Sequence, residues 1–356
     1  MSFKGASLFT DSGVESIEIS KDTNANLMFA CLAVITVLGV MVSLGLGHYK
    51  LSVATVLDVL WSWMTNTASD QTEVITDVVL AIRLPRVIAA LLVGAALAAA
   101  GTAYQTIFRN TLASPTILGV SAGAGFGAAL AMLLQASALV IQMGAFVGGI
   151  TAVASVLLIS RYLGKKSTLV LVLSGLVVSA LFQALTSLLK YVADPLDTLP
   201  SIVFWMLGSL SRVTTNELLL AMPIILIGIV FMYVLRWPTQ VLEVGDEEAR
   251  TLGVRVNLIR VLVILAATFV TAAAVSIAGI VGWVGLLIPH LARLLVGPVY
   301  SKLFPMATLM GAAYLLFVDN ICRSGFNAEL PLGIVTAIIG APLFVFVLLK
   351  VKNQWS

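Results

Sequence analysis

The sequence predicts an all-α polytopic membrane protein with about ten transmembrane helices. Of its 356 residues, 60% are hydrophobic and 10% are charged, and the mean hydropathy is +1.07. Soluble domains carry about 25% charged residues, so this chain has too little polar surface to fold in water. Its apolar residues are gathered into runs that approach the ~20 residues needed to span a bilayer as a helix. These two observations together predict the fold class.

The elements follow in order along the chain. Residues 1–26 are polar and are expected to form a flexible tail, and residues 27–350 form the transmembrane domain. The run that begins at Leu27 is too long for a signal-peptide core, so it is the first span. Residues 200–210 are apolar but too short to cross, which predicts an interfacial or re-entrant helix. The ten predicted spans are 27–47, 87–104, 116–134, 138–160, 168–189, 217–235, 261–278, 282–297, 304–322 and 331–349.

Basic residues predict the orientation. With ten spans and an internal N-terminus, 14 of the 20 lysine and arginine residues fall on one side. Basic residues are enriched on the cytoplasmic side of membrane proteins, so both termini are expected in the cytoplasm. Residues 48–82 then form a polar connection on the outside, where Trp61 and Trp63 suit the membrane interface.

The sequence contains no motif for a disulfide, a metal site, a nucleotide-binding loop or a catalytic site. Cys31 and Cys322 both lie in apolar runs and suggest no disulfide, and His48 and His290 have no metal-ligand spacing. The glycines around Gly123 lack the strand–helix context of a nucleotide loop, and no paired carboxylates suit catalysis. We therefore expect no enzyme, no cofactor, no metal site and no nucleic-acid partner.

The segment 236–260 is a polar island between two strongly apolar runs. Three acidic residues begin a short helical pattern, where they complement the helix dipole, and Gly253 stands where a helix end favours positive φ. Leu242, Gly245, Ala249 and Leu252 fall three, four and three residues apart and predict one small apolar face. This pattern fits a folded element that docks on another protein; a solvated loop with a charge cluster is the alternative.

The interiors of the spans hold almost no ionisable groups. Ion-coupled carriers usually place carboxylates inside the membrane. The sequence therefore favours a transporter that receives its energy from a partner, with a self-contained secondary carrier as the rival from another class.

Three arginines, Arg83, Arg86 and Arg323, lie beside span ends on the predicted outer face. Such arginines suit bidentate recognition of carboxylates. The alternative is that they reach toward lipid headgroups at the interface.

Several stretches together resemble the FecCD family of ABC importer permeases. They are Arg83-Leu-Pro-Arg-Val-Ile-Ala-Ala-Leu-Leu-Val-Gly94, Asn110-Thr-Leu-Ala-Ser-Pro-Thr-Ile-Leu-Gly119, Gly245-Asp-Glu-Glu-Ala-Arg-Thr-Leu-Gly253, Gly282-Trp-Val-Gly-Leu-Leu-Ile-Pro-His-Leu-Ala-Arg293 and Glu329-Leu-Pro-Leu-Gly333. The resemblance covers about residues 27–350. It implies the type II ABC importer fold in the inner membrane. It also implies a second permease subunit, identical or homologous, two cytoplasmic ATP-binding subunits and a periplasmic substrate-binding protein. The implied substrate is a ferric siderophore, with haem and cobalamin as alternatives.

The resemblance also implies roles for particular residues. Coupling helices at about 240–257 would rest on the ATPase, and Arg83, Arg86 and Arg323 would dock the binding protein. A cytoplasmic gate would map to Asn110, Leu112 and Thr168, although Thr111 and Leu169 depart from the expected pattern. The implied coupling residues are Val244, Gly245, Asp246, Glu247, Glu248, Ala249, Arg250, Leu252 and Gly253.

Overall fold

The computed structural model describes residues 12–47, 51–67, 71–163, 168–324 and 328–352, and throughout these ranges the chain is helical and without strands. Helices satisfy their own backbone hydrogen bonds, which is the requirement for crossing lipid. The elements are α1 (Ser12–Gly45), α2 (Val53–Thr65), α3 (Glu73–Asp77), the π-helix η1 (Val78–Arg83), α4 (Leu84–Phe108), the 3-10 helix η2 (Pro115–Leu118), α5 (Val120–Leu133), α6 (Ala138–Tyr162), α7 (Thr168–Val192), α8 (Thr198–Met206), α9 (Thr215–Val234), α10 (Arg236–Val244), α11 (Asp246–Thr251), α12 (Val256–Ala278), α13 (Val284–Val296), α14 (Tyr300–Ser324) and α15 (Leu332–Lys352).

The predicted spans correspond to these helices. Within the described residues, seven helical stretches are long and apolar enough to cross a membrane, and shorter apolar helices include α5, α13 and most of α15. Each of the ten predicted spans matches one of these ten helices. The predicted interfacial helix is α8. The all-helical polytopic fold class is therefore confirmed.

Three boundaries differ from the sequence prediction. α1 begins at Ser12, inside the predicted tail, because residues 14–38 contain neither glycine nor proline to end the helix. Residues 48–82 are largely helical rather than a plain connection: they contain α2, and the second span extends back to Glu73. The third span is interrupted by η2 and by Gly119 at φ 80°, so only α5 remains as a regular helix.

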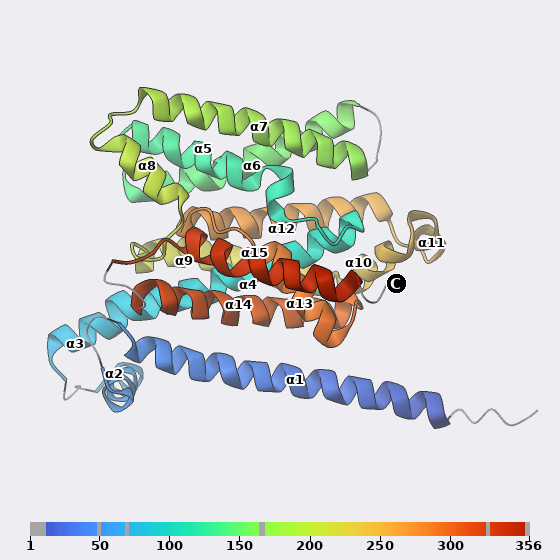
Figure 1. Ribbon diagram of the computed structural model, residues 1–356, viewed down its shortest axis with the longest axis horizontal. Coiled ribbons are helices and arrows are strands. Elements are labelled where there is room, and N and C mark those ends of the chain that lie inside the picture. Colours follow the sequence, from blue (N-terminus) through green and yellow to red (C-terminus); the bar gives the residue numbers. More distant parts are fainter. Residues whose placement is uncertain (1–11, 48–50, 68–70, 164–167, 325–327, 353–356) are drawn as a thin grey trace, which may run out of the picture.

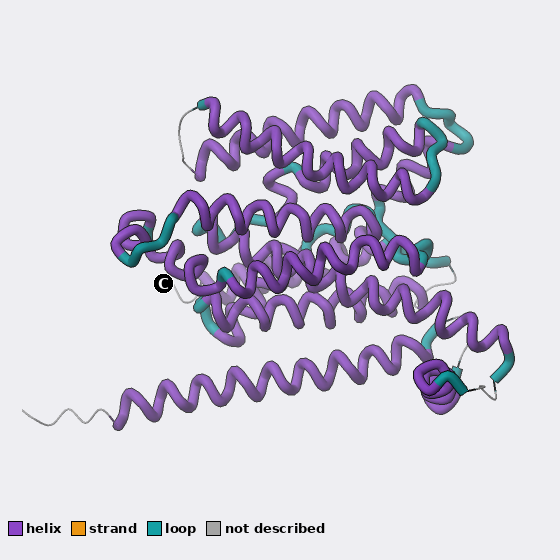
Figure 2. Tube along the Cα trace, turned by 180° about the vertical axis from the view of Figure 1, so that it is seen from behind, coloured by secondary structure: helices purple, strands orange, loops and turns teal. Residues whose placement is uncertain are grey.

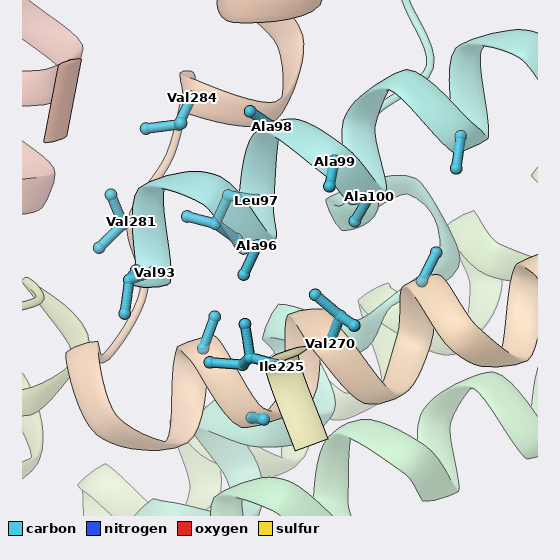
Figure 3. Packing of buried hydrophobic residues seen from close by; sticks show 14 of the residues in the cluster. Val93, Ala96, Leu97, Ala98, Ala99, Ala100, Ile225, Val270, Val281 and Val284 are labelled. Atoms are coloured by element: carbon cyan, nitrogen blue, oxygen red, sulfur yellow. The ribbon is translucent and has the colours of Figure 1, made fainter. Parts of the chain in front are cut away.

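The core of the bundle lies around α4 and α12. Of the most apolar stretch of α12, 72% is buried, against 17% for α1, which lies along one side of the molecule (Figures 1 and 2). The group α5 to α8 forms the opposite side. Figure 3 shows alanines of α4, such as Ala96 and Ala100, facing Ile225 and Val270 on neighbouring helices.

Small residues set how closely these helices approach. A Cβ added at Gly101 of α4 would overlap the carbonyl oxygen of Gly285 in α13, and one added at Gly94 would overlap that of Gly311 in α14. Such contacts let backbones touch where lipid provides no hydrophobic drive for association. The glycines therefore fix the positions of α13 and α14 against α4, and with them the loops at both ends of the bundle.

Candidate functional site: the two polar ends of the bundle

The polar island forms two short helices at one end of the bundle, α10 and α11, joined at Gly245 (Figure 1). α10 buries Thr239, Val241 and Leu242. The acidic first turn of α11 is present as predicted, and Gly253 has φ 79°. The helical character of this segment was therefore predicted correctly from its acids and its glycine.

The predicted apolar face does not point outward as a unit. Leu242 and Ala249 are 1% and 0% exposed because they pack onto the bundle, whereas Leu252 is 60% exposed. The solvent-facing surface is instead a mixed ridge of acidic, basic and apolar side chains. We call the following residues the exposed ridge: Val244, Glu247, Glu248, Arg250, Thr251 and Leu252.

Asp246 ties α11 to two other parts of the bundle. Nη2 of Arg260, in α12, donates to both carboxylate oxygens of Asp246, at 2.9 and 3.1 Å, and Nη2 of Arg109 donates to Oδ1 at 2.5 Å. Nε of Arg109 also donates to the carbonyl oxygen of Leu242 at 2.8 Å. Partial burial acts to raise the pKa of Asp246, but the hydrogen bonds and charges of Arg260 and Arg109 outweigh it and lower the pKa below 3.8.

Arg109 ends α4 in an unusual conformation. It has φ 47° and ψ 37°, in the left-handed region, and its N–H donates to the Thr106 carbonyl while that of Asn110 donates to the Gln105 carbonyl. This is a Schellman motif, in which glycine is the usual residue. A residue with a Cβ in this conformation costs about 1 kcal/mol or more. In the sequence, Arg109 is one of the 14 basic residues that predict the orientation, and nothing in its pattern signalled this role.

Two of the three predicted gate residues, Asn110 and Leu112, lie in the loop after Arg109. Oδ1 of Asn110 accepts a hydrogen bond from the Leu112 N–H at 2.9 Å, and the side chain of Leu112 is 52% exposed. Thr168 begins α7, but its side chain lies outside what the structure describes. The structure thus brings Asn110 and Leu112 together with α10 and α11, through Arg109.

At the opposite end of the bundle, the three predicted docking arginines are buried. Arg83, Arg86 and Arg323 are 5%, 9% and 6% exposed. Arg86 grips the fully buried carboxylate of Asp319: Nε donates to Oδ1 at 3.0 Å and to Oδ2 at 3.1 Å, and Nη2 donates to Oδ1 at 2.8 Å. Nη2 also donates to Oε1 of Glu329 at 2.5 Å.

The other two arginines bind the end of α1. Nη1 of Arg83 donates to the Leu44 carbonyl at 2.5 Å, and Nη2 of Arg323 donates to the carbonyl and hydroxyl oxygens of Ser43. The last carbonyls of a helix have no partner within it and carry partial negative charge, so cations are favourable there. Arg86 does bind a carboxylate in bidentate fashion, but that of Asp319 in the same chain, so the docking of another protein by these arginines stays a prediction. The roles of Asp319, Glu329 and Ser43 in this cluster were not predicted from the sequence.

A cavity of about 800 Å³ lies at the same end of the bundle, between the α5–α8 group and α9, α12 and α15. Its lining includes the amide of Gln142 and the hydroxyls of Ser201, Ser209 and Ser276. Glu329 also lines it, so the arginine cluster and the cavity share a residue. The charged lining residues are Asp197, Arg212, Glu217 and Glu329.

These features define a polytopic helical transporter subunit with a folded polar foot, α10 and α11, at one end and a cavity of mixed lining at the other. In the described residues, no group of three or more histidine, cysteine or carboxylate side chains is placed to hold a metal ion.

The chain matches the FecCD transport family over residues 35–350 and belongs to that family. It is a permease of an ABC transporter and not an enzyme, since the ATPase of such a transporter lies in a partner subunit. The resemblance of the motifs is thereby confirmed.

The names of similar proteins state different transport substrates. The chain is 40% identical to the molybdate import system permease protein MolB of Haemophilus influenzae, over 93% of this chain and 98% of that one. It is also 40% identical to a permease of an iron chelatin transport system of Helicobacter pylori, over 80% of this chain and 86% of that one. A solved structure, of a metal-chelate type ABC transporter in an inward-facing conformation, superposes with a TM-score of 0.83 at 39% identity, over 91% of this chain and 99% of that chain.

Proposed function

We propose that this chain forms the membrane pathway of an importer for a metal chelate of the ferric-siderophore class. The observation that carries this proposal is the cavity of about 800 Å³, whose largely apolar lining, with side chains such as Phe204 and Trp205, also holds hydroxyl and amide groups. A volume near the upper end of the range for small-molecule sites suits a ligand of chelate size. Haem and cobalamin belong to the same broad class of large metal complexes and are the alternatives.

Molybdate is a second candidate, because MolB of Haemophilus influenzae is similar over almost its whole length. Charge argues against it. Three carboxylates and one guanidinium belong to the cavity lining, from Asp197, Glu217, Glu329 and Arg212. Because Glu329 is also paired with Arg86, the lining offers a small dianion only the Arg212 guanidinium beside the Asp197 and Glu217 carboxylates, so it lacks the cluster of cations that would attract one.

We further propose that the exposed ridge receives the force of the ATPase. Val244 and Leu252 are 73% and 60% exposed on an otherwise polar element, and acidic and basic side chains stand between them. Interfaces combine such apolar anchors with a polar rim. Replacing Glu247 and Arg250 with alanine is expected to uncouple ATP hydrolysis from transport, and unchanged uptake in this double variant would contradict the coupling role.

The opposite end would meet the periplasmic binding protein. Carboxylates of that protein would compete with Glu329, whose side chain is 32% exposed, for the guanidinium of Arg86. Both termini would then lie in the cytoplasm, and the chain in the inner membrane beside a second permease subunit.

The substrate is tested by uptake in a strain that lacks only this gene, with the chain supplied on a plasmid. Radiolabelled ferric hydroxamate, ferric catecholate, haem, cobalamin and molybdate are offered in turn. We expect plasmid-dependent uptake of a ferric chelate, suppressed by excess unlabelled chelate and not by molybdate. Plasmid-dependent uptake of molybdate alone would overturn the proposed substrate class and leave the transporter class intact.

A further inference from the structure

We propose that Arg109 is a positioning residue that transmits movement of α11 to the loop of residues 109–113. This inference rests on the proposed function, in which α10 and α11 receive the force of the ATPase. It adds a link that joins the site of force to the end of α4.

The first support is the conflict between the backbone and the residue type. Arg109 occupies the left-handed position of a Schellman motif, where glycine is favoured and an arginine is strained. The backbone alone therefore gives no reason for arginine. Strain at a single position is characteristic of sites where the side chain has a function.

The second support is that the Arg109 guanidinium binds both α10 and α11. It donates to the Leu242 carbonyl of α10 at 2.8 Å and to the Asp246 carboxylate of α11 at 2.5 Å. These two acceptors flank Gly245, the junction of α10 and α11. Arg109 thus holds both sides of the joint, and a change in the angle between the two short helices must move the guanidinium or break one of its bonds.

The third support is the stiffness of the loop that follows. Asn110 accepts from the Leu112 N–H at 2.9 Å through its side chain and from the Ala113 N–H at 3.0 Å through its carbonyl. Its own N–H is bound to the Gln105 carbonyl of α4 at 3.1 Å. Because these bonds close a tight turn, displacement of Arg109 carries the exposed Leu112 with it.

Asp246 also binds Arg260, so the position of α11 and its link to the loop after Arg109 can be tested separately. Arg260, in the buried helix α12, binds both oxygens of Asp246 and holds α11 on the bundle when Arg109 is removed. Loss of the Arg109 side chain should therefore leave α11 folded and in place, while the end of α4 no longer follows it.

The test uses the complete transporter, with its ATPase subunits, in lipid nanodiscs. Spin labels at Leu112→Cys and Tyr162→Cys, two exposed positions at the same end of the bundle, report the distance between the loop and α6 with and without ATP. The variants are Arg109→Gly and Arg109→Gln. Arg161→Gln is the matched control, since Arg161 is an exposed arginine of α6 that lies outside the coupling segment 240–257.

We expect ATP to change the label distance in the unmodified chain and in Arg161→Gln, and to change it little in both Arg109 variants. ATP hydrolysed per ferric hydroxamate transported should rise about tenfold or more in those variants. Arg109→Gly should melt no lower than the unmodified chain, because glycine suits the backbone. A purely structural role predicts the reverse, a lower melting temperature with an unchanged distance response.

The proposal is overturned if Arg109→Gly responds to ATP as the unmodified chain does. If, in the same experiment, alanine at Glu247 and Arg250 abolishes the distance change while Arg109→Gly preserves it, only the role of Arg109 fails. If the unmodified chain shows no response to ATP at all, the proposed function of the ridge fails, and the proposal falls with it.

Discussion

Arg86 of α4 and Asp319 of α14 form a bidentate pair across 233 residues of sequence, with three hydrogen bonds between 2.8 and 3.1 Å. The Asp319 side chain is 0% exposed, and Nε of Arg323 lies 3.8 Å from Oδ2 of Asp319. One buried carboxylate therefore faces two buried guanidiniums, and Glu329 supplies a second negative charge to Arg86. Through Arg83 and Arg323, the same cluster also holds the end of α1, so four segments of the chain meet there.

Removing the Asp319 charge should destabilise the protein. Asp319→Asn keeps the shape of the side chain but leaves the buried Arg323 guanidinium without a counter-charge and leaves Arg86 with only the partly exposed Glu329. Breaking a buried pair on one side costs about 3–5 kcal/mol, whereas replacing both partners with apolar residues is often neutral. In detergent, Asp319→Asn should therefore melt well below the unmodified chain. The double variant Arg86→Met with Asp319→Leu should recover the part of the loss that comes from Arg86, while Arg323 stays without its counter-charge. Equal melting of Asp319→Asn and the unmodified chain would show that the pair does not stabilise the fold.

Glu329→Gln should have a different effect. Arg86 keeps Asp319 in this variant and loses only its partly exposed partner, so the cost to stability is expected to be about 1 kcal/mol or less. If binding-protein carboxylates compete for Arg86, their affinity should rise, by up to about fivefold on the same energy scale. Surface plasmon resonance with the purified binding protein measures this change. A weaker complex would mean that Glu329 itself contacts the partner.

Features that depend on neighbouring residues could be predicted from the sequence, and features that depend on contacts between distant residues could not. Long apolar runs predict helices, because a segment that crosses lipid must satisfy its backbone N–H and C=O groups with its own hydrogen bonds. α2 was not predicted because it is short and combines Asp58 with apolar residues, and the break at η2 lies inside an apolar run. The Arg86–Asp319 pair joins distant positions, and one sequence contains no signal of such a pair. Arg109 was passed over because a helix end with positive φ is expected to carry glycine.

Gly101, which is closely packed, can be compared with Gly282, which is not. A methyl group at Gly101 would overlap the Gly285 carbonyl of α13, whereas one at Gly282 would meet no atom within 4 Å. Gly101→Ala should destabilise the protein by about 1–3 kcal/mol through overpacking, and Gly282→Ala should have no such cost. Thermal unfolding of the two variants beside the unmodified chain measures the difference. Similar melting of both variants would mean that α4 and α13 separate at little cost.

The charge of Asp246 predicts a pH dependence at the polar foot. Because the folded pKa lies below 3.8, the ionised carboxylate stabilises the fold above the ordinary aspartate pKa, and this contribution is lost as the pH falls through the folded value. The difference in melting temperature between the unmodified chain and Asp246→Asn should thus be constant from neutral pH to about 5 and should shrink below about 4. A difference that varies between pH 5 and 8 would point to another titrating group.

Labelling of single cysteines tests the orientation on which the coupling role depends. Glu247 is exposed on α11, and Trp61, which is 66% exposed, lies on α2 at the other end of the bundle (Figure 1). The distribution of basic residues predicts that α11 lies in the cytoplasm. With the native cysteines replaced by serine, a membrane-impermeant maleimide applied to intact spheroplasts should label Trp61→Cys and not Glu247→Cys, and permeabilised cells should label both. Labelling of Glu247→Cys in intact spheroplasts would invert the topology, and α11 would then be out of reach of any cytoplasmic ATPase.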